Sequence, residues 1–392
     1  MSYGATIKNM AIRNDSWHID SNLLIPVIAL ISVGLVMVAS ASFSFADYKF
    51  ADQFLFFKRH VAYLILGVGV AAIGFFVRPE SWAKYSLLWL LISILLLVIV
   101  LIPGIGLNLN GSRRWLSVGG FTLQVSEIAK GAAVIFLASQ LDKHRETMAD
   151  NWLQFGKLTA VVAVMSVLLI VEPDFGSVVV LTLTFAVLMF LGGSRMSHFM
   201  TLLTSMLVAF WLMVKAAPYR LDRLTAYLDP WSDQFNSGYQ LTQSLIAFGR
   251  GEWFGVGLGQ SVQKMLYLPD AHTDFVFAIF AEEFGFIGVL CLLALYGLFI
   301  FRIMQLSKKA IAHQHWYGAY VLIGFGLLLS GQTFINLGVN SGLLPTKGLT
   351  LPFVSYGGSS LITCCGMVGM MLRLGHEINR SKSSLVGVRH GR

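Results

Sequence analysis

The sequence predicts an all-α polytopic membrane protein with about ten transmembrane helices, and three observations lead to this fold class. Hydrophobic residues make up 56% of the 392 residues, whereas charged residues make up 12%, about half of their share in an average soluble domain. Mean hydropathy is +0.71. The apolar residues fall into runs of about 20, the length that crosses a bilayer as a helix. One or two water-soluble cores could not bury this much apolar surface.

The expected spans are separated by charged or helix-breaking residues. The first apolar run is too long for the core of a signal peptide and has no convincing cleavage site, which predicts an uncleaved first span. Glu172, Pro173 and Asp174 interrupt a stretch that is too long for one crossing, which predicts a tight hairpin. The ten expected spans are 23–42, 60–77, 87–105, 125–141, 152–171, 176–191, 198–214, 273–301, 316–337 and 357–372.

The distribution of Lys and Arg predicts the orientation. If the N-terminus is cytoplasmic, sixteen of these residues fall in inside loops and tails and six in short outside loops, as the positive-inside rule requires. Both termini are then cytoplasmic, with tails at 1–22 and 375–392 around a transmembrane domain at 23–374. The long loop between spans seven and eight, about 215–272, lies outside. Apolar residues at helical spacing in 239–248 predict an amphipathic helix on the outer membrane face.

Several other kinds of protein and site are disfavoured. The net charge of +8 is scattered over many short loops without the basic patch that a nucleic-acid-binding protein carries. Cys291, Cys364 and Cys365 lie within apolar runs, so no disulfide framework is implied. The histidines lack metal-ligand spacing, so no metal site is indicated. The glycines of 255–259 follow no buried strand, which favours loop glycine over a nucleotide-binding motif.

The first group of candidate residues is 268–275, where the long outer loop enters span eight, with Glu282 and Glu283 about two turns deeper. A carboxylate at the mouth of an apolar helix has its pKa raised by partial desolvation, which suits a general base near neutral pH. Asp274 is the candidate. Alternatively, Thr273 or Asp274 simply caps the N-terminus of span eight, and the two roles are compatible.

The second group lies on the outer side at the start of span four. Glu127 and Lys130 are three residues apart, so they share one helix face and can pair. This pair is either purely structural, neutralising two charges near the interface, or part of a binding site. In the second case Lys130 and Arg114 bind an anionic group such as a diphosphate beside Asp274.

The third group runs from 336–340 to 345–360, immediately before span ten. Its density of proline and glycine predicts a re-entrant loop, which membrane depth tolerates only where the loop is buried in protein or wet. The alternative is a turn with tight glycine packing. Lys347 is the one cation in the loop.

The segment 345–360, with the sequence PTKGLTLPFVSYGGSS, closely resembles the signature of the shape, elongation, division and sporulation (SEDS) family of bacterial membrane proteins. Further similar motifs lie at 269–275 with 281–285, at 172–176, and at 112–115 with Glu127 and Lys130. Together these motifs cover 23–374. Within the family, residues 346–348 and Phe353 are more similar to the cell-division branch than to the elongation branch.

The resemblance implies an inverting peptidoglycan glycosyltransferase that polymerises lipid II into β-1,4 glycan strands. It would act at the outer face of the bacterial inner membrane, at the division septum. Asp274 is implied as the essential carboxylate and general base. The other expected substrate-binding residues are Arg114 and Lys130 at the diphosphate, Glu127 holding Lys130, Lys347 at the diphosphate or bracing its loop, and the motif residues His272, Thr273 and Ser355. The resemblance implies no certain cofactor, and assistance by Mg²⁺ or Mn²⁺ stays open.

The implied partners are undecaprenyl-diphosphate-linked glycan, a class B penicillin-binding protein (FtsI in the division case) and other divisome proteins. Three alternatives stay open: a lipid II flippase, an elongation polymerase of the same family, and a non-catalytic scaffold. A flippase should carry essential charges along a path to the inner leaflet. The candidate charges instead map near the outer face, which favours the polymerase.

Overall fold

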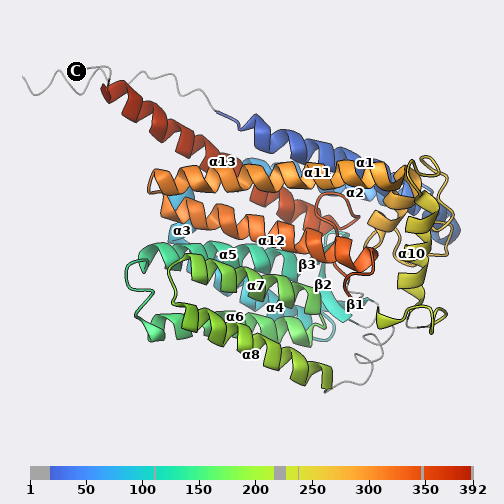
Figure 1. Cartoon of the computed structure of the whole chain (residues 1–392), viewed down its shortest axis with the longest axis horizontal. Coiled ribbons are helices and arrows are strands. Elements are labelled where there is room, and N and C mark those ends of the chain that lie inside the picture. The colour runs from blue at the N-terminus through green and yellow to red at the C-terminus, as the bar shows by residue number, and fades with distance from the viewer. Residues whose placement is uncertain (1–17, 110–111, 216–226, 237, 346–347, 390–392) are drawn as a thin grey trace, which may run out of the picture.

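The computed structural model describes residues 18–109, 112–215, 227–236, 238–345 and 348–389. Long helices lie side by side in one bundle, as Figure 1 shows. At one end of the bundle lie α10 (Tyr239–Gly251), its loops and a small sheet; α1 begins and α13 ends at the other end. The end with α10 is called the outer end below.

Each of the ten expected spans overlaps one long helix. Among the described residues, six helices are long and apolar enough to cross a membrane, namely Ser21–Phe50, Leu55–Phe76, Trp152–Val171, Val276–Ala312, Trp316–Asn340 and Gly358–Arg380. Ser86–Leu101 and Phe175–Leu191 are shorter apolar helices. The chain is therefore a multi-pass membrane protein. The remaining bounds complete the order: α1 Ser21–Phe50, α2 Leu55–Phe76, α3 Pro79–Lys84, α4 Ser86–Leu101, α5 Val125–Lys143, α6 Trp152–Val171, α7 Phe175–Leu191, α8 Met196–Lys215, α11 Val276–Ala312, α12 Trp316–Asn340 and α13 Gly358–Arg389.

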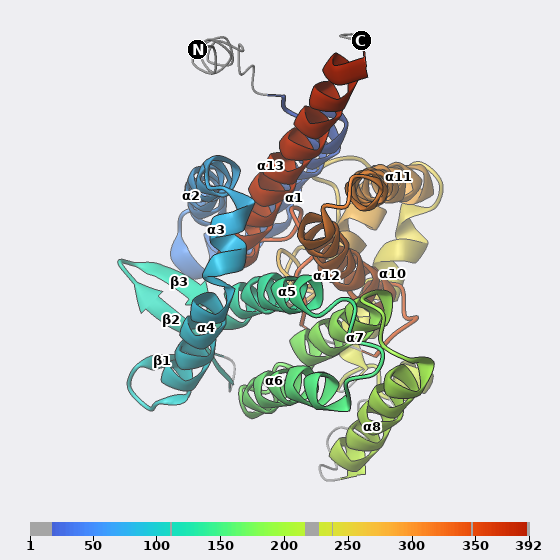
Figure 2. The same ribbon diagram turned by 90° about the vertical axis from the view of Figure 1, so that its left-hand side faces the viewer.

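The centre of the bundle is formed by α5 and α12, as the end-on view of Figure 2 shows. Most residues of α5 are buried, including the charged Glu127 and Lys130. Helix α13 packs closely on α2 through glycines, since a Cβ on Gly369 would lie 2.0 Å from the carbonyl oxygen of Ala71. Helix α13 also continues through the stretch expected as a C-terminal tail, to Arg389.

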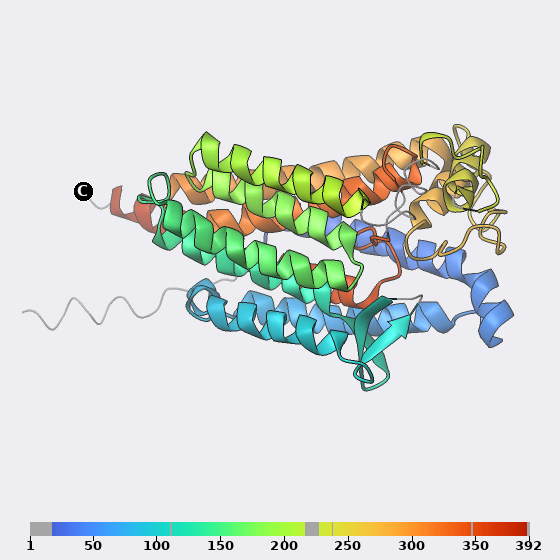
Figure 3. The same cartoon turned by 90° about the horizontal axis from the view of Figure 1, so that it is seen from below.

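The expectation of an exclusively helical fold was wrong in one respect. Three short strands, β1 (Gly106–Leu109), β2 (Ser112–Val118) and β3 (Phe121–Gln124), form an antiparallel sheet in the order β1-β2-β3. Gly119 and Gly120, with φ of 58° and 84°, form the two-residue turn that suits such a hairpin. The sheet projects beside α4 and α5 near the outer end, as Figure 3 shows. β1 and β3 have four residues each, too few for a clear hydrophobic pattern, and the seven residues of β2, SRRWLSV, do not alternate between apolar and polar as a half-buried strand would.

The predicted hairpin between spans five and six is confirmed. Helix α6 ends at Val171 and α7 begins at Phe175. The Asp174 carboxylate caps α7, accepting hydrogen bonds from the Ser177 amide at 3.3 Å and the Ser177 hydroxyl at 2.8 Å. The hairpin therefore holds a buried carboxylate at the start of a helix, where the helix dipole favours it.

Helix α11 begins three residues later than expected and is interrupted once. Gly285 has φ of 65° and ψ of −168° inside the helix, a conformation that favours glycine. The backbone groups freed by this break are satisfied by the loop after α10. The amide of Phe286 donates to the Glu252 carbonyl at 2.9 Å, and the amide of Val256 donates to the Glu282 carbonyl at 2.9 Å.

The predicted amphipathic helix in the long loop is present as α10. It runs across the end of the bundle rather than along it (Figure 1). Its buried residues include Leu241 and Ala247, and the ring of Phe248 packs edge-on against Phe277 of α11 at 5.4 Å between centroids. Its apolar face is thus covered by the start of α11.

Candidate active site

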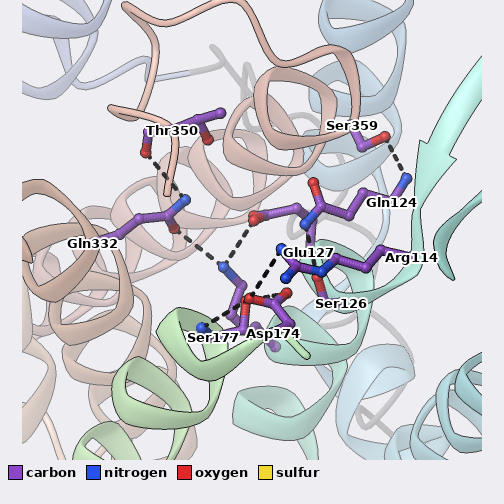
Figure 4. Close-up of polar contacts among 10 residues, drawn as sticks. Arg114, Gln124, Ser126, Glu127, Asp174, Ser177, Gln332, Thr350 and Ser359 are labelled. Atoms are coloured by element: carbon purple, nitrogen blue, oxygen red, sulfur yellow. Dashed lines mark hydrogen bonds and ion pairs between the residues drawn. The ribbon is translucent and has the colours of Figure 1, made fainter. Parts of the chain in front are cut away.

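Side chains from all three groups of candidate residues converge at the outer end of the bundle. Figure 4 shows polar side chains from β2, α5, α7, α12 and the loop before α13 pointing toward one another. The loop at 348–357 contains no helix or strand, and Leu349, Leu351, Phe353 and Ser355 in it are buried. The predicted loop is therefore embedded in protein, as irregular backbone within a membrane requires.

Asp274 lies in a turn that precedes α11. The amides of Thr273 and Phe275 both donate to the Asp270 carbonyl, at 3.1 and 3.3 Å. The main-chain oxygen of Asp274 accepts hydrogen bonds from the side-chain amides of Asn336 and Asn340, each at 2.9 Å. Residues four apart share one helix face. The side-chain amides of Asn336 and Asn340 on α12 therefore both fix the Asp274 turn in position.

The same two asparagines join this turn to the buried loop and to α11. The side-chain amide of Asn336 also donates to the Leu349 carbonyl at 2.6 Å. The side-chain oxygen of Asn340 accepts from the Ala278 amide in the first turn of α11 at 3.2 Å, and this amide also donates to the Phe275 carbonyl at 3.0 Å. Asp274 and the loop therefore keep a fixed relation to each other.

The alternative that Thr273 or Asp274 caps α11 was wrong. The N-cap residue is Phe275, without a side-chain cap. The Thr273 hydroxyl donates to the Asp270 carbonyl at 3.1 Å, and Asn340 supplies the missing cap from a neighbouring helix. The Asp274 carboxylate is therefore not used as a helix cap.

The environment of Asp274 raises the pKa of its carboxyl towards neutrality. The side chain is half-buried, and its pKa is raised to about 7, first by burial and then by the nearby charge of Asp270, against the opposing effect of Arg114. A carboxylate with a pKa near the working pH is well suited to general base catalysis. Asp270 itself has a raised pKa because of burial.

Arg114 of β2 binds the turn between α6 and α7. Its Nε donates to the Glu172 carbonyl at 2.9 Å and its Nη2 donates to the Pro173 carbonyl at 2.5 Å, while Nη1 lies 4.0 Å from the Asp174 carboxylate. The Arg114 side chain is 19% exposed. The guanidinium is thus fixed in position mainly by backbone carbonyls, and its charge acts on Asp274.

The Glu172 carboxyl beside it is unusual. It is fully buried, and neither oxygen has a hydrogen-bond partner among the described residues. Its pKa is raised to about 8, first by burial and then by the charge of Asp174, with Arg114 opposing. The group is therefore protonated and uncharged at neutral pH.

The predicted pair of Glu127 and Lys130 forms inside the bundle. The Lys130 ammonium lies 2.9 Å from the Glu127 carboxylate and donates to the side-chain oxygen of Gln332 at 3.3 Å. Gln332 in turn donates to the Thr350 carbonyl at 3.3 Å, so the network links α5, α12 and the buried loop (Figure 4). Lys130 is only 1% exposed.

Gln332 was not among the expected site residues, and Asn336 and Asn340 belonged to the third group without an assigned role. The three residues recur every four residues of α12, so they form one polar stripe along an otherwise apolar helix. This spacing was the signal that could have found them, because polar side chains within spans usually face a partner or a cavity.

The remaining expected residues shape the surroundings. His272 is buried, with its ring centroid 4.6 Å from Phe56 and 5.3 Å from Phe45, and burial lowers its pKa to about 4. The amide of Tyr356 donates to the His272 carbonyl at 2.9 Å. The Ser355 hydroxyl accepts from the Leu351 amide at 2.9 Å, closing the loop. Lys347 lies outside the described residues.

Glu282 and Glu283 anchor the loop after α10 instead of joining Asp274. Both are buried. Glu282 accepts from the Ser261 hydroxyl and pairs with Arg250 at 3.2 Å. Glu283 pairs with Lys264 and accepts from the Ser40 hydroxyl at 2.7 Å. Within the described ranges, no group of three or more His, Cys, Asp or Glu side chains is arranged to hold a metal ion.

Comparison with known sequences gives a consistent set of relatives. The family model FTSW_RODA_SPOVE, described as cell cycle protein, matches residues 21–380. A protein of Saccharophagus degradans named "Probable peptidoglycan glycosyltransferase FtsW" is 49% identical over 363 residues, covering 93% of this chain and 94% of that protein. A protein of Hahella chejuensis with the same name is 50% identical over 359 residues, covering 92% and 90% of the two chains.

Solved structures show the same fold. A chain from a structure titled "Structural coordination of polymerization and crosslinking by a peptidoglycan synthase complex" has a TM-score of 0.74 and 28% identity, covering 92% of this chain and 98% of that one. The rod shape determining protein RodA of Thermus thermophilus has a TM-score of 0.67 and 28% identity, covering 93% and 98%.

Proposed function

The chain belongs to the FtsW/RodA/SpoVE family and is a peptidoglycan glycosyltransferase, and from this premise we propose that it polymerises lipid II with Asp274 as the general base. The observation that carries the proposal is the environment of Asp274. Its carboxylate is half-buried, its turn is held by Asn336 and Asn340, and its pKa is raised to about 7.

The proposed reaction is one in-line displacement. Asp274 takes the proton of the acceptor sugar 4-hydroxyl, whose oxygen bonds to the anomeric carbon of the growing chain. The bond from that carbon to the diphosphate breaks, and undecaprenyl diphosphate leaves with its electron pair. An α-linked donor thereby gives a β-1,4 product with inversion. Such a reaction needs one base and cations near the leaving group.

We assign the leaving diphosphate to Arg114 and Lys130. Arg114 is partly exposed and donates mainly to backbone carbonyls, so much of its charge is available to an anion. Lys130 is buried against Glu127, which makes it a fixed charge beneath the site. His272, Thr273 and Ser355 are assigned to the substrate-binding wall, which is supported by their place in the Asp274 turn and the adjoining loop. Lys347 is assigned to the same anion on sequence grounds.

The proposed topology has ten spans, both termini in the cytoplasm and the 215–272 loop outside. It places Asp274 on the outer face of the inner membrane, where lipid-linked precursors are polymerised. The count of Lys and Arg supports this orientation. The proposed partner is a class B penicillin-binding protein, FtsI at the division septum, together with other divisome proteins. The peptidoglycan synthase complex named above supports a partner of that class.

The decisive experiment measures glycan synthesis from purified lipid II by the protein with its cognate transpeptidase. Asp274→Asn should reduce polymerisation by about a hundredfold or more, the usual loss on removing a general base. The matched control is Asp52→Asn, which removes an exposed carboxylate paired with Lys58. Equal product from wild type and Asp274→Asn would exclude Asp274 as the base. Loss of all polymerisation with retained lipid II translocation would favour the flippase.

A further inference from the structure

An apolar groove runs along the outer half of α1. It has a volume of about 680 Å³ and is lined by two walls. One wall is α1 with Phe57 of α2, and the other is the loop after α10, which lies against the outer end of α1 (Figure 3). The lining residues are Leu35, Val36, Ala39, Ser40, Phe43, Ser44, Phe57, Leu258, Gly259, Lys264 and Met265.

The groove is open to the surroundings of the bundle. Val36 and Phe43 on the α1 wall are 44% and 40% exposed, and Leu258 and Met265 on the loop wall are 55% and 53% exposed. Helix α1 is long and apolar enough to cross a membrane. A hydrocarbon chain can therefore enter the groove sideways from the bilayer without passing through water.

The floor of the groove is polar but neutral. The Lys264 ammonium, 6% exposed, pairs with the buried Glu283 carboxylate and donates to the Ser40 hydroxyl at 2.8 Å. Because the charges cancel within the protein, the floor does not require an anionic ligand. An uncharged chain suits this groove better than a phosphate head group.

The groove adjoins the wall of the proposed active site. Its lining residue Phe57 follows Phe56, whose ring packs on His272 at 4.6 Å. Its lining residue Ser44 precedes Phe45, whose ring packs on His272 at 5.3 Å. His272 is two residues from Asp274. At the outer ends of α1 and α2, Phe45 and Phe56 therefore contact His272, and the adjacent residues Ser44 and Phe57 line the groove.

We propose that this groove binds the isoprenoid chain of the lipid-linked substrate, so that the chain is anchored beside the turn that carries Asp274. The proposal rests on the proposed function for the identity of the substrate. It assigns a site to the part of the substrate that does not react. Binding energy from such a remote part helps to hold the reacting atoms in place.

The test uses undecaprenyl diphosphate with a photoreactive diazirine on its terminal isoprene unit, added to the full-length protein in nanodiscs. Light should attach the probe to groove residues such as Val36 and Phe43, as mapped by mass spectrometry. Ala39→Trp fills the groove from α1, and Leu258→Trp fills it from the exposed loop wall if the first variant folds poorly. Each should lower labelling about tenfold, equivalent to excluding roughly two methylene groups.

The matched control is Ala29→Trp, the same substitution on a half-buried position of α1 outside the groove, and it should label like wild type. Unlabelled undecaprenyl diphosphate should compete, and phosphatidylglycerol at the same concentration should not. Labelling elsewhere, labelling unaffected by both tryptophans, or equal competition by phosphatidylglycerol would overturn the proposal. Because labelling needs no turnover, its result is independent of whether the chain polymerises lipid II.

Discussion

The carboxylate of Asp274 lies directly against the backbone of Gly348. A Cβ atom on Gly348 would lie 2.8 Å from Oδ2 of Asp274, closer than Cβ atoms normally approach a neighbouring atom. The glycine of the buried loop therefore leaves room for the carboxylate in its present position. The Asp274 contact atom is at the end of a side chain, whereas Gly348 contributes backbone. If a Cβ atom is added to Gly348, the Asp274 carboxylate is therefore the group that must move.

Gly348→Ala is expected to fold normally and to lose activity. The added methyl group turns the Asp274 carboxylate away, and a displacement of about 1 Å can reduce a rate about a hundredfold. Polymerisation of lipid II measures the loss, and thermal unfolding checks the fold. Gly249→Ala is the matched control, because a Cβ there meets no atom within 4 Å. An active Gly348→Ala protein would show that the carboxylate need not keep this position.

The pH dependence of polymerisation should follow Asp274. A general base acts when deprotonated, and the pKa of Asp274 is raised to about 7, so the rate should rise with pH up to about 7 and then level off. The negative charge of Asp270 contributes to this shift. Asp270→Asn should therefore move the acid limb to lower pH, and asparagine tolerates the positive φ of 52° at this position. An unmoved limb would assign the titration to another group.

Glu172→Gln should keep activity and stabilise the fold. The folded chain holds the Glu172 proton up to about pH 8, whereas the unfolded chain releases it near the ordinary carboxyl pKa. Folding must therefore take up a proton, and stability falls as pH rises between these values. Glutamine removes this cost, by up to about 3 kcal/mol near neutral pH. Thermal unfolding across pH measures the effect, and a less stable variant would contradict it.

The buried pair in α5 predicts a non-additive mutant cycle. Removing either partner leaves the other charge buried and unpaired, so Glu127→Ala and Lys130→Ala should each cost about 3–5 kcal/mol of stability. The double variant should lose less than the sum. Lipid II polymerisation at a temperature where each variant is folded separates the two roles. Full activity of folded Lys130→Ala would remove Lys130 from the proposed mechanism.

Asn336→Ala should lower the turnover rate more than it changes KM. The side-chain amide donates to the carbonyls of Asp274 and Leu349 at 2.9 and 2.6 Å. Its loss removes the side-chain donor to the Leu349 carbonyl, at about 1–3 kcal/mol, and leaves the Asp274 carbonyl bonded to Asn340 alone. The base and the loop would then lose their fixed relation. Steady-state kinetics measure the split. Ser341→Ala is the control, because it removes only a hydroxyl that donates to the Leu337 carbonyl at the end of α12. A change confined to KM would assign Asn336 to substrate binding instead.

The sequence predicted the long helices well because each has a strong local signal. The apolar runs, the break at 172–174 and the helical spacing in 239–248 depend on neighbouring residues only. The sheet at 106–124 lacked such a signal because β1 and β3 are short, β2 has no alternation of apolar and polar residues, and the strands are stabilised by pairing with each other. Local sequence patterns therefore predicted the helices of the bundle. They did not predict that Arg114 lies on strand β2.

The sequence predicted the charged residues of the candidate site. It did not predict the hydrogen bonds that position them. The pair of Glu127 and Lys130 follows from spacing along one helix. The capping of α11 by Asn340 and the tie from Asn336 to Leu349 join segments distant in sequence. Such contacts depend on how the helices pack, which a single sequence does not reveal.

The break in α11 at Gly285 bears on the order in which the chain is built. The amides of Phe286 and Ile287 donate to carbonyls of Glu252 and Trp253, at 2.9 and 3.1 Å, and these residues precede α11 in the chain. Synthesis proceeds from the N-terminus, so the acceptors emerge from the ribosome before the donors. The loop after α10 therefore exists before the broken turn of α11 is synthesised, and its carbonyls can accept these two amides as soon as that turn folds.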